Sequence, residues 1–309
     1  MPITLEQITL LYKSPFLALT QQAAAIHATN VKSNEIELCQ LISVKTGGCP
    51  EDCAYCSQSN QHETEIKINP LLSVSEVEQI ARAAKVKGVK RICMGAAYKS
   101  PTSAAITRTA EYIAAIKSHG LETCATLGSL TPEQANQLKK AGLDYYNHNI
   151  DTSPEYYSQI IGTRTFQARL DTLTHVGAAG IKVCCGGILG LGETSNDRIS
   201  FIYALSQLPY PATSIPINTL IKVAGTKLAN APDLDKFELL RSIATLRIIF
   251  PTTRIRLSAG RTLLSELEQA MCFMIGANSI FYGDQLLTAP NNLQDADTQL
   301  LKKLGIKHV

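Results

Sequence analysis

The sequence contains no tryptophan, and charged residues make up only 18% of it. Its 29 lysines and arginines nearly balance its 26 aspartates and glutamates, so the formal net charge is +3 and no long basic run is present. Proteins that bind nucleic acid usually concentrate positive charge on one face or along one segment. The composition therefore predicts no binding to nucleic acid.

Long hydrophobic runs are also missing. No segment reaches the roughly 18 consecutive apolar residues of a membrane-spanning helix. Residues 1–11 lack the basic segment and apolar block of an export signal. Nine cysteines are an odd number for a disulfide framework, and in a chain without an export signal they point to metal binding or catalysis. These features predict a protein without a membrane segment, located in the reducing cytoplasm.

A repeated joint between helix and strand organises the chain. In each joint a glycine ends a helix-like segment and a short β-rich run follows at once. The five glycines are Gly88, Gly120, Gly142, Gly180 and Gly276. Three further β-rich runs, near 38–46, 214–221 and 254–258, bring the predicted strands to eight. Capping-box patterns begin helices at Ser73 and Thr131.

Eight alternating strand and helix units predict an α/β fold, a complete (β/α)8 TIM-type barrel. An open doubly wound sheet would also alternate strands and helices, but it usually carries a glycine-rich phosphate loop after its first strand, and no GxGxxG occurs there. We predict a single domain over 1–309. It consists of an N-terminal helical extension over 1–35 that breaks near Ser14 and Pro15, a barrel over 36–283 and a C-terminal extension over 284–309.

Alternation along the predicted strands separates the inside of the barrel from the outside. The face that packs against helices must be apolar, whereas the inward face carries polar residues near the strand ends. The inward faces identified in this way include Cys93, Cys124, Cys184, Asn149, Asp151, Asn218, Arg254 and Arg256. Cys184 is preferred over its neighbour Cys185 on this basis. The two inward arginines would be costly to bury without anionic partners.

Three cysteines lie close together just after the first predicted strand. Cys49, Cys53 and Cys56 have the spacing C-x3-C-x2-C. Three thiolates in one tight loop can hold three irons of a cubane cluster, and one iron then stays open to a substrate or cofactor. A zinc site completed by His62 is the alternative, but structural zinc loops usually pair two C-x2-C ends across a longer gap. The spacing therefore favours an iron–sulfur cluster that takes part in chemistry.

This cysteine loop is the motif of the radical S-adenosylmethionine (SAM) enzymes, so the chain resembles that superfamily. Longer segments resemble the biotin synthase family within it. These segments are SVKTGGCPEDCAYCSQS at 43–59, YYNHNIDTS at 145–153, PIN at 216–218 and RLSAGR at 256–261. The resemblance extends over about 43–288, which is nearly the whole chain.

The resemblance implies both a reaction and its cofactors. Biotin synthases are complete βα barrels, usually homodimeric, that insert sulfur between two unactivated carbons of dethiobiotin in the last step of biotin biosynthesis. In that family the open iron of a 4Fe-4S cluster binds SAM, and one electron splits SAM into methionine and a 5'-deoxyadenosyl radical. The resemblance therefore implies a sulfurtransferase with dethiobiotin as substrate and a flavodoxin-type electron donor as partner.

A second cluster, of the 2Fe-2S type, is also implied by the resemblance, as the expected sulfur donor. Its matching positions are Cys93, Cys124, Cys184 and Arg256, all on the inward faces described above. Arginine is an unusual ligand because its guanidinium group is almost always protonated. Arg256 either ligates iron directly or donates hydrogen bonds to the cluster, and the sequence leaves both roles open.

Further residues match positions that contact SAM or the substrate in that family. They are Tyr55, Gly95, Asn149, Asp151, Arg169 and Asn218. The tyrosine matches an aromatic residue near the adenine, the glycine a close approach to the methionine amino group, and the arginine a contact with the methionine carboxylate. Asn149 and Asp151 match contacts with the ribose and the ureido ring, and Asn218 matches a substrate contact.

Several reactive residue types receive no role in this interpretation. Cys39, Cys185 and Cys272 belong to no motif, and free cysteines are commonly small buried hydrophobic residues. His148 lies on the strand face opposite to Asn149, so we expect it to pack between strand and helix.

Overall fold

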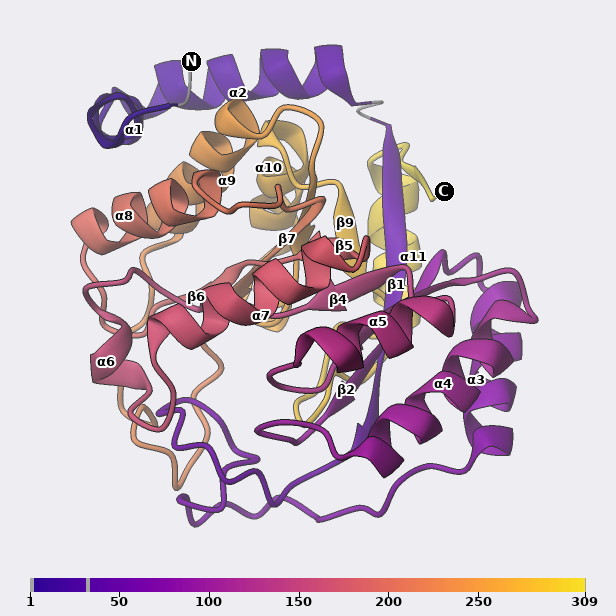
Figure 1. Ribbon diagram of the computed structural model, residues 1–309. Coiled ribbons are helices and arrows are strands. Elements are labelled where there is room, and N and C mark those ends of the chain that lie inside the picture. The colour runs from indigo at the N-terminus through magenta and orange to yellow at the C-terminus, as the bar shows by residue number, and fades with distance from the viewer. Residues whose placement is uncertain (1–2, 32–33, 309) are drawn as a thin grey trace.

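The computed structural model describes residues 3–31 and 34–308 (Figure 1). Two helices, α1 (Leu5–Tyr12) and α2 (Phe16–Asn30), precede the first strand. The hydroxyl of Thr4 caps α1 by accepting a hydrogen bond from a backbone N–H of its first turn. Pro15, at the N-cap of α2, separates the two helices. The predicted helical extension, with its break near Ser14 and Pro15, is confirmed.

Eight parallel strands form a closed barrel. They are β1 (Glu35–Lys45), β2 (Arg91–Ala96), β3 (Glu122–Thr126), β4 (Tyr145–Asn147), β5 (Lys182–Cys184), β7 (Ser214–Thr219), β8 (Arg254–Leu257) and β9 (Ser279–Phe281). Neighbours pair in this order, and pairing of β9 with β1 closes the ring. Strand β6 (Gly187–Leu189) adds to β7, and β10 (Lys307–His308) pairs with the start of β1. The TIM-type barrel predicted from the sequence is confirmed.

Helices cover the outside of this barrel (Figure 1). They are α3 (Val74–Val86), α4 (Ser103–Lys117), α5 (Pro132–Lys140), α6 (Tyr157–Ile160), α7 (Phe166–Ala178), α8 (Ser195–Ser206), α9 (Lys236–Ile249), the 3-10 helix η1 (Arg261–Leu263), α10 (Glu266–Ile275) and α11 (Gln294–Lys303). Ser73 and Thr131 form the predicted capping boxes of α3 and α5. Strand residues such as Ile92, Ala125 and Ile255 are fully buried in the main hydrophobic core.

The glycines at the helix-to-strand joints take the conformation that such turns require. Gly88, Gly120, Gly142 and Gly180 have φ values of 75°, 69°, 94° and 73°. Residues with a Cβ rarely adopt this left-handed region, so glycine ends each helix and lets the chain turn into the next strand. The repeated joint seen in the sequence is therefore a repeated turn geometry.

The two ends of the barrel are covered by different parts of the chain. Figure 1 shows α2 across the end where the strands begin, and the segment that follows β1 at the opposite end. The carboxyl ends of the strands point toward that segment. In TIM-type barrels this is the face on which active sites are built.

Candidate active site

The three cysteines of the first motif follow β1 directly, at the carboxyl end of the barrel. The Cys49 N–H donates a hydrogen bond to the Gln58 carbonyl over 2.9 Å, and the Asn60 N–H donates to the Cys49 carbonyl over 2.8 Å. The Cys56 N–H donates to the Cys53 carbonyl over 2.9 Å. These backbone hydrogen bonds hold the three thiols in a compact loop.

Acidic residues between the cysteines anchor this loop to the barrel. Glu51 Oε1 lies 3.0 Å from Arg164 Nη2, and both side chains are almost completely buried. Asp52 Oδ1 accepts hydrogen bonds from the backbone N–H groups of Gly162 and Thr163 over 2.9 and 3.0 Å. The position of the cysteines therefore depends on the segment that follows α6.

Burial also determines the protonation of the three thiols in the absence of a metal. Burial raises the pKa of Cys49 and Cys53, and it raises the pKa of Cys56 to about 11. The thiols therefore hold their protons until a metal replaces them. Among the described side chains no three of His, Cys, Asp or Glu converge on a single ion. A four-iron cluster does not need such convergence, because each thiolate binds a different iron.

His62, the fourth ligand of the alternative zinc site, contacts the cysteine loop through its ring. Its Nδ1 atom lies 2.9 Å from the carbonyl oxygen of Cys56. This contact orients the imidazole against the loop backbone.

A cavity leads from the cysteine loop into the barrel. Its empty space is about 1210 Å³, including the open mouth. Its lining includes Tyr55, Cys56, Cys93, Cys124, Asn149, Asp151, Asn218 and Arg256. Residues of both predicted cluster sites therefore face the same space, together with four of the predicted cofactor and substrate contacts.

Asp151 joins two of the predicted SAM contacts. Its Oδ2 atom accepts a hydrogen bond from the Tyr55 hydroxyl over 3.1 Å and another from Arg169 Nη2 over 2.8 Å. Burial raises the pKa of Asp151, although Arg169 opposes this shift. The Nε atom of Arg169 also donates to the Tyr157 hydroxyl over 2.9 Å. The three predicted residues thus form one hydrogen-bonded group at the cavity wall.

The two predicted asparagines are held in fixed orientations. Asn149 Oδ1 accepts hydrogen bonds from Asn147 Nδ2 over 2.8 Å and from a backbone N–H over 3.1 Å. Asn218 Oδ1 accepts from the Ala259 N–H over 3.1 Å, and its Nδ2 donates to a carbonyl of β6 over 3.0 Å. Both side chains line the cavity with their amide groups already oriented.

Gly95 lies at the carboxyl end of β2, where the sequence predicts a close approach. A Cβ atom at this position would lie 2.5 Å from Leu287 Cδ2. Leu287 belongs to the segment after β9 and itself lines the cavity. The closest neighbour of Gly95 in this structure is therefore the flexible end of a leucine side chain.

Four cysteines, one more than the predicted three, meet inside the barrel. Cys39, Cys93, Cys124 and Cys184 form one buried group with Tyr145. Cys93 and Cys124 are register partners on β2 and β3. By contrast, Cys185 packs in the main hydrophobic core, so alternation correctly separates it from Cys184.

Contacts among these thiols change their protonation. Hydrogen bonds with Cys124 and Cys39 lower the pKa of Cys93, and a hydrogen bond with Cys124 lowers the pKa of Cys184 to about 6. Hydrogen bonds with Cys184 and Cys93 raise the pKa of Cys124. The group therefore shares its protons and includes thiols that ionise readily, as metal ligands must.

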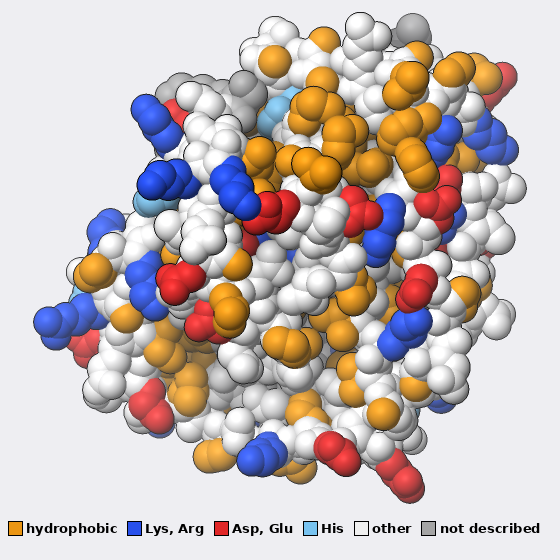
Figure 2. All heavy atoms as spheres, turned by 180° about the vertical axis from the view of Figure 1, so that it is seen from behind, with side chains coloured by type: hydrophobic (Ala, Val, Ile, Leu, Met, Phe, Trp, Pro, Cys, Tyr) orange, Lys and Arg blue, Asp and Glu red, His pale blue; other side chains and the backbone are white. Residues whose placement is uncertain are grey.

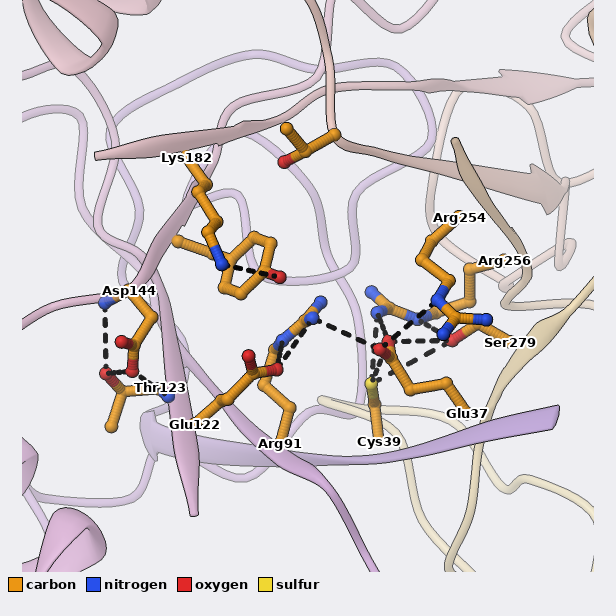
Figure 3. A network of polar contacts seen from close by, with 12 residues as sticks. Glu37, Cys39, Arg91, Glu122, Thr123, Asp144, Lys182, Arg254, Arg256 and Ser279 are labelled. Atoms are coloured by element: carbon orange, nitrogen blue, oxygen red, sulfur yellow. Dashed lines mark hydrogen bonds and ion pairs between the residues drawn. The ribbon is translucent and has the colours of Figure 1, made fainter. Parts of the chain in front are cut away.

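Beside these cysteines, the carboxylate of Glu37 lies close to three arginine side chains (Figure 3). Glu37 Oε1 lies 3.4 Å from Arg256 Nη2. Glu37 Oε2 lies 3.3 Å from Arg91 Nη2 and 3.7 Å from Arg254 Nε. Burial opposes the shift, but the three guanidinium groups lower the pKa of Glu37. Glu37 is the anionic partner that the two inward arginines were expected to need.

Two buried donors in this region lack a hydrogen-bond partner in residues 3–31 and 34–308. They are Arg91 Nη1 and Ser214 Oγ. Ser214 is the register partner of Cys184, and the guanidinium of Arg91 stacks 3.4 Å from the centre of the Tyr145 ring. Buried donors are normally satisfied, and the sulfides of a cluster would accept such hydrogen bonds. The four thiols and these donors therefore fit an iron–sulfur cluster.

Glu37 and Cys39 are the site residues that the motif comparison misses. Both lie on β1 and share its inward face with Leu41, by the same two-residue alternation that identifies Cys93 on β2. Applied to the first strand, this alternation would have indicated both residues.

His148 is buried, but it is not part of the group formed by Glu37, the arginines and the inner cysteines. Burial and the nearby arginines Arg169 and Arg164 hold the pKa of His148 well below its usual range, so the ring is neutral. Its ring lies 6.4 Å from that of Tyr146 in a tilted arrangement. The structure places it in packing contacts, as expected from its strand face.

The family model described as "Radical SAM superfamily" matches residues 43–203, and the one described as "Biotin and Thiamin Synthesis associated domain" matches residues 216–307. The biotin synthase of Coxiella burnetii (strain RSA 493 / Nine Mile phase I) is 54% identical over 297 residues, which cover 96% of this chain and 92% of that protein. The biotin synthase of Legionella pneumophila (strain Lens) is 53% identical over 303 residues, 98% of this chain and 96% of that protein.

Solved structures with low sequence identity share the fold. Methylornithine synthase matches with a TM-score of 0.84 at 18% identity, over 100% of this chain and 95% of that one. An FeFe-hydrogenase maturase from Carboxydothermus hydrogenoformans matches with a TM-score of 0.84 at 20% identity, over 99% of this chain and 76% of that one. At this level of sequence identity, these matches show a shared fold only.

Proposed function

Because this chain belongs to the biotin synthase family of radical SAM enzymes, we propose that it converts dethiobiotin to biotin with sulfur drawn from a second, 2Fe-2S cluster. The observation that carries this proposal is the shared cavity. Cys56 of the first cysteine motif and Cys93 and Cys124 of the inner group line the same space. A substrate bound there would lie between the radical source and the sulfur source.

The first cluster site is assigned to Cys49, Cys53 and Cys56. When bound, a 4Fe-4S cluster with SAM supplies the carbon radical that removes hydrogen atoms from the substrate. The protein's own contribution is to hold the three thiols in place through the buried Glu51–Arg164 pair. Burial of the loop also limits access of water to the reacting groups.

The second cluster site is assigned to Cys93, Cys124 and Cys184 with Arg256. The three cysteines belong to the buried inner group, and Arg256 is buried beside them. The partnerless donors Arg91 Nη1 and Ser214 Oγ support this assignment. A 2Fe-2S cluster held by these residues would supply sulfur to a substrate in the cavity that Cys93, Cys124 and Arg256 line.

Contacts to SAM and substrate are assigned to six residues around the cavity. We assign Tyr55 to the adenine, Asp151 and Asn149 to the ribose and the ureido ring, and Asn218 to the substrate. Gly95 and Arg169 are assigned to the amino and carboxylate groups of the methionine part. The hydrogen bonds among Tyr55, Asp151 and Arg169 hold these side chains close together before any ligand enters.

The proposal extends to partners and organisation. We propose that residues 1–309 act as one domain, that two chains form a homodimer, and that a flavodoxin-type protein delivers electrons in the cytoplasm. Figure 2 shows hydrophobic side chains gathered on the upper part of the rear face. Exposed large apolar side chains on α2, α9 and α10, such as Leu17, Phe237 and Leu267, support an interface. None of the helices in the described part of the chain is long and apolar enough to cross a membrane.

The deciding experiment is an anaerobic reaction of the cluster-reconstituted protein with dethiobiotin, SAM and a strong reductant. Mass spectrometry should detect both 5'-deoxyadenosine and biotin. The Cys53→Ala variant, which lacks one ligand of the first cluster, should produce neither compound. Deoxyadenosine without biotin, in a sample whose second cluster is present, would keep the radical enzyme and reject dethiobiotin as its substrate.

A further inference from the structure

We propose that the buried ion pair of Arg261 and Asp297 holds one wall of the cavity in place, so that both residues act as positioning residues for substrate binding. The wall is the segment 284–291, which we call the C-terminal hairpin. The inference rests on dethiobiotin as the substrate of the proposed function. It assigns a role to two residues that do not themselves line the cavity.

The C-terminal hairpin follows the last barrel strand and folds back on itself. The Asn291 N–H donates a hydrogen bond to the Asp284 carbonyl over 2.9 Å, and the Leu286 N–H donates to the Ala289 carbonyl over 2.9 Å. The tip of the hairpin lines the cavity with four consecutive residues, Leu286, Leu287, Thr288 and Ala289. The hairpin is therefore one wall of the space in which the substrate is proposed to bind.

Two contacts place the tip of the C-terminal hairpin against the ends of the first two strands. Leu287 packs against Gly95 at the end of β2. The hydroxyl oxygen of Thr288 lies 3.0 Å from that of Ser57, in the loop after β1. A leucine side chain and one pair of neutral hydroxyls hold a segment only weakly. The position of the tip therefore depends on how the base of the hairpin is held.

The base of the C-terminal hairpin is held at the carbonyl group of Phe281, the last residue of β9. This carbonyl accepts a hydrogen bond from Arg261 Nη1 over 3.0 Å and another from Asn291 Nδ2 over 2.9 Å. Asn291 Nδ2 also donates to the Gly283 carbonyl over 2.7 Å. One guanidinium and one amide thus fix the point at which the strand becomes the hairpin.

The same guanidinium also holds the far end of the hairpin, because its anionic partner lies on α11. Arg261 Nη1 lies 3.1 Å from Asp297 Oδ2, Arg261 Nη2 contacts Asp297 Oδ1, and both side chains are fully buried. Gln269 Oε1, on α10, accepts hydrogen bonds from Arg261 Nε and Nη2 over 3.3 and 3.1 Å. A bidentate pair of arginine and carboxylate has a fixed geometry. Arg261 therefore ties the strand before the hairpin to the helix after it.

The competing role for this pair is to stabilise the C-terminal part of the fold and nothing else. Apolar residues of similar volume can often replace a buried ion pair without loss of stability. Apolar residues cannot, however, donate a hydrogen bond to the Phe281 carbonyl. An apolar replacement therefore separates the two roles, because it preserves the packing and removes the tie.

The test is a double variant of the full chain, Arg261→Met with Asp297→Leu, which leaves neither charge of the pair buried alone. Its thermal unfolding should stay close to that of the unmodified protein. Hydrogen exchange followed by mass spectrometry should be faster in peptides that cover 284–291 and unchanged in those that cover β2. This readout requires neither substrate nor turnover.

Binding of dethiobiotin to the double variant is then measured by calorimetric titration into reconstituted protein that holds SAM. Affinity should fall by about 10-fold, because the substrate must now order the hairpin when it binds. The rate of biotin formation in a single turnover at saturating dethiobiotin should stay within about twofold, since the reacting groups are unchanged.

A milder second variant is Arg261→Lys. It keeps a positive charge beside Asp297, but an ammonium group lacks the planar fork that reaches the carboxylate and the Phe281 carbonyl together. Exchange in the hairpin should again be faster and dethiobiotin should bind more weakly. This variant decides the question by itself if the double variant does not fold.

The matched control is Glu266→Gln. Glu266 forms an exposed ion pair with Lys303 over 2.7 Å, which also joins α10 to α11. Hairpin exchange and the affinity for dethiobiotin should both match those of the unmodified protein.

Three results would overturn the inference. Unchanged hairpin exchange in the folded double variant would leave the pair with a structural role only. Faster exchange with unchanged affinity for dethiobiotin would show that the hairpin does not hold the substrate. An unmodified protein that does not bind dethiobiotin would reject the substrate of the proposed function, and this inference with it. The first two results leave the proposed function intact, so the failures can be told apart.

Discussion

Arg169 Nη2 lies 2.8 Å from Asp151 Oδ2 in a pair that is almost completely buried. Asp151 has a φ of 65°, a left-handed conformation that aspartate tolerates better than most residues with a Cβ. The same oxygen accepts the hydroxyl of Tyr55 from the cysteine loop. One carboxylate thus joins the loop after β1 to α7 across the mouth of the cavity.

Replacement of Arg169 by glutamine should weaken binding of SAM. The variant loses the charge assigned to the methionine carboxylate, and hydrogen bonds to charged groups contribute about 1.5–3 kcal/mol, so affinity should fall by about 10- to 100-fold. Calorimetric titration of SAM into the anaerobically reconstituted protein measures this. Arg108→Gln, on the exposed face of α4, is the control. Unchanged affinity at full iron content would remove Arg169 from the SAM site.

Replacement of Glu51 by glutamine should loosen the cysteine loop. The change leaves Arg164 buried without its anionic partner, and loss of one partner from a buried pair typically costs about 3–5 kcal/mol. Iron should therefore leave the first cluster faster in the presence of a chelator, as followed by the decay of visible absorption. Glu111→Gln, in the exposed pair with Arg108, should match the unmodified protein. Equal rates for both variants would contradict an anchoring role for Glu51.

Local patterns in the sequence were sufficient for the barrel and for much of its interior. The joint glycines have positive φ because a helix end followed by a strand requires it, and that signal lies within a few residues. Alternation likewise separates Cys184 from Cys185, because a shift of one position moves a side chain to the other face. Both features depend on neighbours in the chain.

Contacts between distant segments could not be predicted in the same way. Glu37 meets Arg256 from 219 positions away, and Leu287 covers Gly95 from a segment beyond the last barrel strand. These contacts depend on closure of the barrel and on how the chain after β9 folds back. A sequence pattern can state that a buried arginine needs an anion, but the closed structure identifies which one.

Replacement of Glu37 by glutamine should destabilise the cluster-free protein more than the protein that holds its clusters. It leaves three guanidinium groups close together without their shared carboxylate, and we expect a loss of about 3 kcal/mol in the free energy of unfolding. The loss should be smaller after reconstitution, since an anionic cluster would compensate the arginines. Thermal unfolding of both forms measures the difference.

The control for this substitution is Glu122→Gln. Glu122 pairs with Arg91 over 2.9 Å, but its side chain is 28% exposed, so its loss should cost about 1 kcal/mol or less. A destabilisation by Glu37→Gln that is the same with and without clusters would show that no anionic group binds beside these arginines.

His27, on α2, should make the protein less stable in mild acid. Burial and the nearby Arg247 lower the pKa of His27 from 6.5 to about 4. Well above pH 6.5 the imidazole is neutral in both states, whereas at lower pH the unfolded chain takes up a proton that the folded protein accepts only near pH 4. The free energy of unfolding should therefore fall by about 2 kcal/mol between pH 7.5 and pH 5 through this residue alone.

Urea denaturation at these two pH values, under anaerobic conditions, tests the contribution of His27. His27→Leu should reduce the loss of stability on acidification by about 2 kcal/mol, because no group at this position can then take up the proton. His308→Gln, at an exposed position near the C-terminus, should keep the full loss. If His27→Leu and the unmodified protein lose the same stability, His27 is protonated as easily in the folded protein as in the unfolded chain, and its burial against Arg247 carries no penalty.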